Sequence, residues 1–219
     1  MITIFAGHYG SGKTMLAVNK ALELRKAHPG ERIAVADLDI VNPYFRALDS
    51  KKLLDERGIE TIASRFTNTN LEAPAMPPEG AAIFDTPGLH GIIDVGGDDR
   101  GAYALGRYAL RIKEAKAEMI LVCNMYRPLS RHPRQVLEIK REIEAASGSV
   151  FTALVNNSNL GKDTSAQDVL ASMGWIEEVS KLCSLPVKAV CAKSALTPEL
   201  GHIPGFLALE VTSLEKWRI

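Results

Sequence analysis

The fold is decided by the stretch Ala6-Gly7-His8-Tyr9-Gly10-Ser11-Gly12-Lys13-Thr14. From Gly7 onward it satisfies the pattern G-x-x-x-x-G-K-[ST], the Walker A or P-loop motif, whose backbone cradles phosphate groups. A short apolar run, residues 2–6, precedes the loop, and apolar residues recur at helical spacing from residue 13 to residue 28. Strand, glycine loop and helix in this order are the context that the motif requires. The sequence therefore predicts a P-loop between a first strand and a first helix.

The residue types in this loop suit the phosphates of a nucleotide. Gly10 and Gly12 let backbone N–H groups curl around the β-phosphate, and the helix presents its N-terminus to the negative charge. Lys13 is expected to reach the β- and γ-phosphates as a catalytic residue, and the Thr14 hydroxyl to ligate Mg²⁺. The expected nucleotide-binding residues of the loop are Gly7, Gly10, Ser11, Gly12, Lys13, Thr14 and Met15.

The rest of the chain alternates between strand-like and helix-like segments. Strands are expected at residues 2–6, 32–37, 59–63, 91–94, 119–124, 150–156 and 186–192, and helices at residues 13–28, 43–57, 98–112, 133–146 and 164–182. Thr164 and Gln167 are expected to cap the last helix, and residues 64–80 to form a long loop with at most one helical turn after Pro78. This alternation predicts an α/β, three-layer P-loop NTPase fold with a mainly parallel sheet flanked by helices, built as a single domain over residues 1–219.

Phosphoryl transfer also needs a carboxylate at the end of a strand to hold the water shell of magnesium, and two segments offer one. Residues 81–88 and 89–97 both read as an apolar run followed by Asp-x-x-Gly, with Asp85 and Asp94 as the acids. Asp94 is favoured, because a strand that ends there leads through two glycines directly into the next helix. Asp85 stays the alternative, since its segment is closer to the D-x-x-G switch of GTPases.

A second acidic pair, Asp37-Leu38-Asp39, ends the second expected strand. Ligands gather at the carboxyl ends of parallel strands, so this pair is expected at the phosphate end of the sheet. Asp39 is the candidate for orienting the attacking water or a magnesium-bound water. A capping role for this aspartate in the next element is the alternative.

Three segments together resemble the CobQ/CobB/MinD/ParA group of P-loop nucleotide-binding proteins, of the SIMIBI class, and above all its stand-alone ATP-binding members. They are residues 6–14, residues 37–46 and the run Asp94-Val95-Gly96-Gly97-Asp98-Asp99. The resemblance covers nearly the whole chain and adds weight to Asp94 as the magnesium carboxylate. It further implies that Asp39 is the switch I acid near the metal, that Asn156 contacts adenine, and that Asn157 is a second such contact.

One departure from that group concerns the second residue of the loop. MinD and ParA members carry a signature lysine there, which reaches the partner's nucleotide across a dimer, and here the residue is His8. The nucleotide-sandwich dimer is therefore not carried over, and a homodimer stays open. His8 and Tyr9 are expected either to meet a partner or substrate or to pack on the outside of the loop. Arg46 is a candidate for supplying the missing positive charge.

Composition excludes several classes of partner. Lys plus Arg and Asp plus Glu both number 26, so no basic field favours nucleic acid. No apolar run approaches the ~20 residues of a membrane span, and residues 206–219 balance their charges and are expected to pack as a final strand or helix rather than to bind lipid. The three cysteines show no paired spacing and are expected to be reduced and buried. These features predict a cytoplasmic protein without stable membrane association.

The expected function is that of a slow ATPase, a nucleotide-dependent switch or assembly factor with a protein partner, using ATP and Mg²⁺. ATP is favoured over GTP because residues 155–159, Val-Asn-Asn-Ser-Asn, lack the Asn-Lys-x-Asp segment of guanine pockets. The alternative is an enzyme of the CobQ/CobB or dethiobiotin synthetase kind, which activates a carboxylate in a pocket lined by residues 64–80; no amidotransferase domain is expected after residue 219. A metallochaperone GTPase ranks third, because the chain has no histidine-rich or Cys-x-x-Cys tract.

Overall fold

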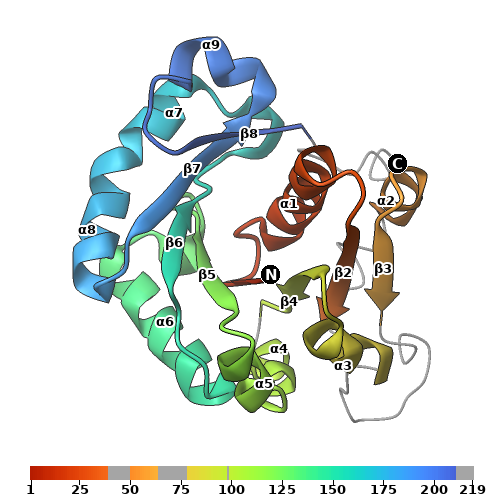
Figure 1. Ribbon diagram of the computed structural model, residues 1–219. Helices are drawn as coiled ribbons and strands as arrows, with labels where there is room; N and C mark the ends of the chain where they lie inside the picture. Colours follow the sequence, from red (N-terminus) through yellow and green to blue (C-terminus); the bar gives the residue numbers. More distant parts are fainter. Residues whose placement is uncertain (39–49, 64–77, 98, 211–219) are drawn as a thin grey trace, which may run out of the picture.

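The computed structural model describes residues 1–38, 50–63, 78–97 and 99–210. The strands are β1 (Ile2–Ala6), β2 (Arg32–Leu38), β3 (Glu60–Ala63), β4 (Leu89–Val95), β5 (Glu118–Cys123), β6 (Ala153–Asn156), β7 (Val187–Lys193) and β8 (Phe206–Leu209). The α-helices are α1 (Lys13–Ala27), α2 (Lys51–Glu56), α3 (Pro78–Asp85), α4 (Asp99–Gly106), α5 (Ala109–Glu114), α6 (Pro133–Ser147), α7 (Ala166–Ala171), α8 (Met173–Cys183) and α9 (Thr197–Leu200), shown in Figure 1. Short 3₁₀ turns are η3 (Pro128–Ser130), η4 (Gly161–Asp163) and η5 (Ser194–Leu196).

The strands form one sheet in the order β3-β2-β4-β1-β5-β6-β7-β8. Every pairing between them is parallel, which confirms the expected parallel sheet. Strand β1 lies in the middle, between β4 and β5. The carboxyl end of β1 is therefore a switch point of the topology, the place where open α/β sheets bind their ligands.

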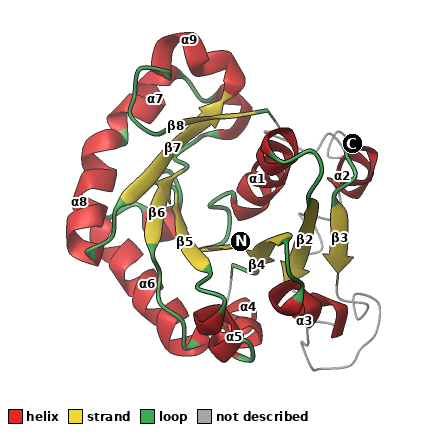
Figure 2. Ribbon diagram, in the orientation of Figure 1, coloured by secondary structure: helices red, strands yellow, loops and turns green. Residues whose placement is uncertain are grey.

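Helices cover both faces of this sheet, as Figure 2 shows. Successive side chains of a strand point to opposite faces, and in β1 both faces are buried. Ile4 belongs to a core that includes residues of α3, α4, α5, α6 and α8, and Phe5 belongs to a core that includes residues of α1 and α2. A third, smaller core joins α7 and α9 to β7. This arrangement of helices, sheet and helices confirms the expected three-layer α/β fold.

Residues 81–88 and 89–97, the two segments that could each provide the strand before the magnesium carboxylate, fold differently. Residues 89–95 form β4, every residue of which is buried, and β4 pairs with both β1 and β2. The earlier apolar run lies instead in α3, where Ile83 packs into the core beside Leu89 and Ile93. The expected strand at residues 91–94 is confirmed, and it begins two residues earlier and ends one residue later, at Val95. The helix that begins at Pro78 is longer than the single turn that was expected.

Two helices that the sequence predicts as continuous are each broken in two. Residues 99–114 divide into α4 and α5, with a turn in which Tyr108 N donates to Leu105 O. Residues 166–183 divide into α7 and α8 around Ser172. The Ser172 hydroxyl donates to Val169 O and accepts a hydrogen bond from Asn156 at the end of β6. This buried tie to the sheet redirects the chain, which helical periodicity alone does not reveal.

The expected cap of α7 was displaced by one residue. Ser165 is the N-cap, its hydroxyl accepts from Asp168 N, and the Asp168 carboxylate accepts from Ser165 N. The prediction of Thr164 and Gln167 is therefore wrong. A hydrogen bond from the Ser165 hydroxyl to the Asp168 carboxylate, followed by the one from Ser165 N, holds the pKa of Asp168 below its usual value. Thr164 instead closes the preceding turn, where its hydroxyl donates to Gly161 O.

The remaining expectations concern the ends and the cysteines. Residues 206–209 add β8 to the edge of the sheet beside β7, while residues 211–219 lie outside the described residues. All three cysteines are free and buried, and burial raises the pKa of the Cys123 and Cys191 thiols. Among the described helices, none is both long enough and apolar enough to cross a lipid bilayer.

Candidate functional site

The P-loop joins the end of β1 to the start of α1 at the middle of the sheet. Gly12, the residue before α1, has φ 92°, a conformation that residues with a side chain rarely adopt. A Cβ atom there would lie 2.2 Å from Asn157 Nδ2. Position 12 therefore accepts glycine alone, and helix α1 begins directly after it. The first turn of a helix offers backbone N–H groups that attract anions.

Lys13 lies within the loop rather than in solvent. Only 6% of its surface is exposed, and its Nζ donates to His8 O at 3.2 Å. The same carbonyl accepts from Ser11 N at 3.2 Å, so the lysine holds the loop in its curled shape. This placement brings a positive charge to the cradle in which phosphate binds in P-loop proteins.

Thr14 and Asp94 meet beside the loop. The Thr14 hydroxyl donates to Asp94 Oδ2 at 2.6 Å, and Asp94 is buried at 1% exposure. In the sheet Asp94 lies between Phe5 of β1 and Asp37 of β2, itself buried. A hydroxyl and carboxylates are hard oxygen ligands of the kind that Mg²⁺ prefers. The donor set therefore fits magnesium at this place.

Asp85, the alternative acid, lies elsewhere. It ends α3, its side chain is 60% exposed, and it accepts from Arg111 Nη1 at 2.6 Å. The loop's hydroxyl thus pairs with Asp94 and not with Asp85. Asp39 and Arg46, the other charged candidates, lie outside the described residues, as does the loop 64–77 that was expected to line an acceptor pocket.

The segment after β4 lies against the P-loop. A Cβ atom at Gly97 would be 2.7 Å from the backbone of Tyr9 and 3.0 Å from Lys13 Nζ. No room for a side chain exists there, which explains why position 97 holds a glycine. The Tyr9 side chain points outward and is 59% exposed.

The two asparagines at the carboxyl end of β6, Asn156 within the strand and Asn157 directly after it, make contacts within the protein. Asn157 is buried, and its Nδ2 donates to Ser11 O at 2.8 Å. Asn156 is fully buried, its Nδ2 donates to Ser172 Oγ at 2.8 Å, and its Oδ1 accepts from Ser158 N. Asn157 therefore supports the P-loop, and Asn156 ties the end of β6 to the turn between α7 and α8. Contact with a base stays a prediction for both residues.

Arg127 is a neighbour of the loop that sequence reasoning missed. Its Nε donates to Gly10 O at 2.8 Å. The signal that could have identified it is its place four residues after the end of β5, the strand that pairs with β1. The carboxyl ends of adjacent parallel strands lie at the same end of the sheet. The side chain adds a second positive charge at the P-loop.

Comparison with solved structures shows which fold this is. No family model matches the chain, and no curated protein sequence matches it. The structure is similar to FtsY, the signal recognition particle receptor, of Elizabethkingia anophelis (TM-score 0.54, 19% identity, 86% of this chain and 57% of that one). It is also similar to the cell division protein FtsY of Thermotoga maritima (TM-score 0.55, 16% identity, 88% of this chain and 61% of that one).

A third similar structure is the signal recognition particle 54 kDa protein of Aeropyrum pernix K1 in complex with GDP (TM-score 0.53, 14% identity, 86% of this chain and 40% of that one). The chain thus spans less than two thirds of these proteins. At such identities the likeness concerns the fold, and the finer expectation of the CobQ/CobB/MinD/ParA group is not shown by it. The chain has the α/β fold of P-loop NTPase domains, a parallel sheet flanked by helices, and shares this fold with the three structures.

Proposed function

We propose that this protein binds a magnesium nucleotide in the loop 7–14 and acts as a slow ATPase that switches between nucleotide-bound states. The observation that carries the proposal is the 2.6 Å hydrogen bond between Thr14 and Asp94. It joins the two motifs that a P-loop protein needs, one from the loop and one from a strand end 80 residues later.

Different residues of the loop would contact the phosphate groups and the magnesium ion. Lys13 and the N-terminus of α1 balance the negative charge. The Ser11 hydroxyl is buried and has no hydrogen-bond partner among the described residues, so a phosphate oxygen gives it one. Thr14 and Asp94 would hold Mg²⁺, which when bound neutralises charge that develops on the phosphate oxygens.

We propose ATP as the preferred nucleotide. A guanine pocket uses an acid to accept hydrogen bonds from the base, and the segment 155–159 at the end of β6 has none. Its Asn157 side chain is engaged with the loop. The similar structure that contains GDP makes guanine the alternative. Competition of ATP and GTP for a fluorescent ATP analogue tests the choice.

Slow turnover follows from the charge near the γ-phosphate. A cation supplied to the transition state contributes about 10³- to 10⁵-fold in rate. The signature lysine of MinD and ParA, which this sequence resembles, is replaced here by His8. Arg127, bonded to Gly10 O, is one cation in the same chain; Arg46 and an arginine of an unidentified protein partner are others. We propose that full ATPase activity requires a protein partner that supplies such a cation. A second copy of this chain, in a homodimer, is one candidate for that partner.

Phosphate release by the purified protein, with light scattering to give its oligomeric state, tests this proposal. We expect turnover below about 1 per second, and a further fall in the Arg127→Ala variant. Arg131→Ala is the matched control, because Arg131 is exposed just after η3. The proposed slow turnover would be contradicted if the protein turns over ATP faster than about 1 per second and neither Arg127→Ala nor Arg46→Ala lowers that rate.

A further inference from the structure

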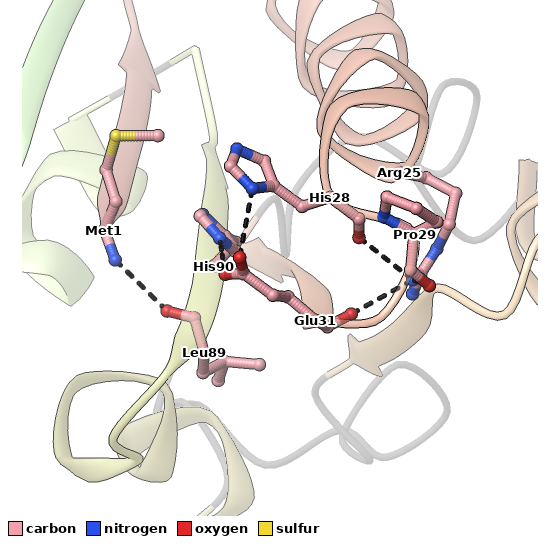
Figure 3. A network of polar contacts seen from close by, with 7 residues as sticks. All are labelled: Met1, Arg25, His28, Pro29, Glu31, Leu89 and His90. Carbon is pink, nitrogen blue, oxygen red and sulfur yellow. Dashed lines mark hydrogen bonds and ion pairs between the residues drawn. The ribbon is translucent and has the colours of Figure 1, made fainter.

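A cluster of two histidines and one glutamate lies at the amino-terminal ends of β2 and β4, the end of the sheet opposite the P-loop. His28 follows the end of α1, Glu31 precedes β2, and His90 is the second residue of β4. Figure 3 shows the three side chains converging from these separate segments. Helix α1 has 15 residues, so about 22 Å of helix separates the cluster from the P-loop. The cluster is therefore distinct from the expected magnesium site.

The ligand-forming atoms of the cluster face one another. Glu31 Oε1 lies 3.0 Å from His28 Nδ1, and Glu31 Oε2 lies 2.5 Å from His90 Nε2. One nitrogen of each ring and a carboxylate oxygen all lie within 4.8 Å of one another, and the rings stack with centroids 4.7 Å apart. The hydrogen bond from His90, followed by the attraction of His28, holds the pKa of Glu31 below its usual value.

The backbone around these residues is held in place by other contacts. The guanidinium of Arg25 donates to the carbonyls of Pro29, Glu31 and Gly58 at 2.8, 3.0 and 2.7 Å. On the other side, the amino group of Met1 donates to Leu89 O at 3.2 Å, next to His90. Figure 3 shows these two supports on either side of the cluster. The backbone that carries the three side chains is thus held in place by contacts within the protein.

We propose that His28, Glu31 and His90 bind one divalent transition-metal ion of the zinc type. Two imidazole nitrogens and one carboxylate oxygen are ligands that such ions prefer, and they are the protein ligands of zinc sites that keep an open position. The two hydrogen bonds to Glu31 show that the same atoms already approach within the spacing of ligands around a single ion. When the ion binds, the proton that each ring shares with Glu31 moves to the other ring nitrogen or is released to water, because a nitrogen that ligates a metal carries no proton.

Burial of the three residues gives the site one closed and one open side. His90 is buried, and its Nδ1 has no hydrogen-bond partner among the described residues, which leaves Nε2 as the nitrogen that faces the cluster. The His28 and Glu31 side chains are 39% and 50% exposed. An ion enters from that side, and water occupies its remaining coordination position. The bound ion fastens the end of α1 to β4.

Titration with Co²⁺ alone, without nucleotide, tests the proposal, because tetrahedral Co²⁺ has visible absorption bands of high intensity. Zn²⁺ alone is then added in competition, with bound metal counted after equilibrium dialysis. The variants are His28→Gln and Glu31→Gln, whose side chains are 39% and 50% exposed, so that loss of folding is not expected. His202→Gln is the matched control, since His202 is exposed near α9 and outside the cluster.

We expect one Co²⁺ per wild-type chain, with bands that Zn²⁺ removes. Removing a ligand is expected to weaken binding by about 100-fold or more, because even changes in the residues behind metal ligands weaken it by about 10- to 100-fold. His202→Gln should bind as the wild type does, and circular dichroism should show that all variants are folded. Absence of tight binding by the wild type, or undiminished binding by His28→Gln and Glu31→Gln, overturns the proposal. Neither result depends on the proposed nucleotide function.

Discussion

Replacement of Asp94 by asparagine separates the role of its charge from the role of its shape. Asparagine has nearly the same volume, and its amide oxygen still accepts from the Thr14 hydroxyl, so the buried contact of 2.6 Å is preserved. What is lost is one negative charge at the place where the donor set fits magnesium. The variant is therefore expected to fold and to bind nucleotide less well only when magnesium is present.

The size of the effect follows from the burial of Asp94, which is 1% exposed. Contacts that involve a charged group contribute ~1.5–3 kcal/mol, and about 1.4 kcal/mol corresponds to a factor of ten in affinity. Asp94→Asn should therefore weaken Mg-ATP binding by about 10- to 150-fold. Asp85→Asn is the matched control, because its ion pair with Arg111 lies at the surface, with side chains 60% and 43% exposed. Such pairs contribute little to stability, and this one is not at the loop.

Isothermal titration of ATP with magnesium and with EDTA measures the effect. The ratio of the two affinities should fall in Asp94→Asn and stay unchanged in Asp85→Asn. An equal ratio in Asp94→Asn and the wild type, or a larger fall in Asp85→Asn, would refute the assignment of Asp94 to magnesium.

Further predictions concern the loop, the base and one helix cap. Lys13→Ala should abolish tight ATP binding, because the backbone alone does not balance the phosphate charge. Unchanged affinity in isothermal titration would contradict the assignment of residues 7–14 as a P-loop. Gly97→Ala should weaken ATP binding about tenfold, since overpacking costs ~1–3 kcal/mol and the new methyl meets the backbone of Tyr9; Gly174→Ala, with open space around it, should not. ATP should displace a fluorescent ATP analogue at lower concentration than GTP, and equal displacement would remove the argument from the segment after β6. Ser165→Ala should reduce the free energy of unfolding by about 1 kcal/mol through the lost cap. The pKa of Asp168 is lowered in the folded state, so its share of stability is present above its unfolded pKa and is lost as the pH falls through the folded one; thermal melts of Asp168→Asn against wild type at neutral and acid pH should converge at low pH.

The sequence by itself determined the class of fold and the position of the phosphate loop. The pattern from Gly7 to Thr14 requires only local geometry: a strand, a glycine-rich turn and a helix. Residues close together in the sequence determine such geometry. The alternation of apolar strands and amphipathic helices likewise determined a parallel sheet covered on both faces. Even the preference for a strand that ends at Asp94 followed from local order, since two glycines and a helix come after it.

Contacts between residues far apart in the chain were decided only by the tertiary structure. The breaks at Ser172 and between α4 and α5 arise from packing against other elements, which periodicity within one helix does not contain. Arg127 lies 117 residues from the glycine whose carbonyl it contacts. His90 lies 59 residues from Glu31, and only the pairing of β2 with β4 brings the two together. Side-chain partners across a sheet depend on strand order and register, and these are properties of the whole fold.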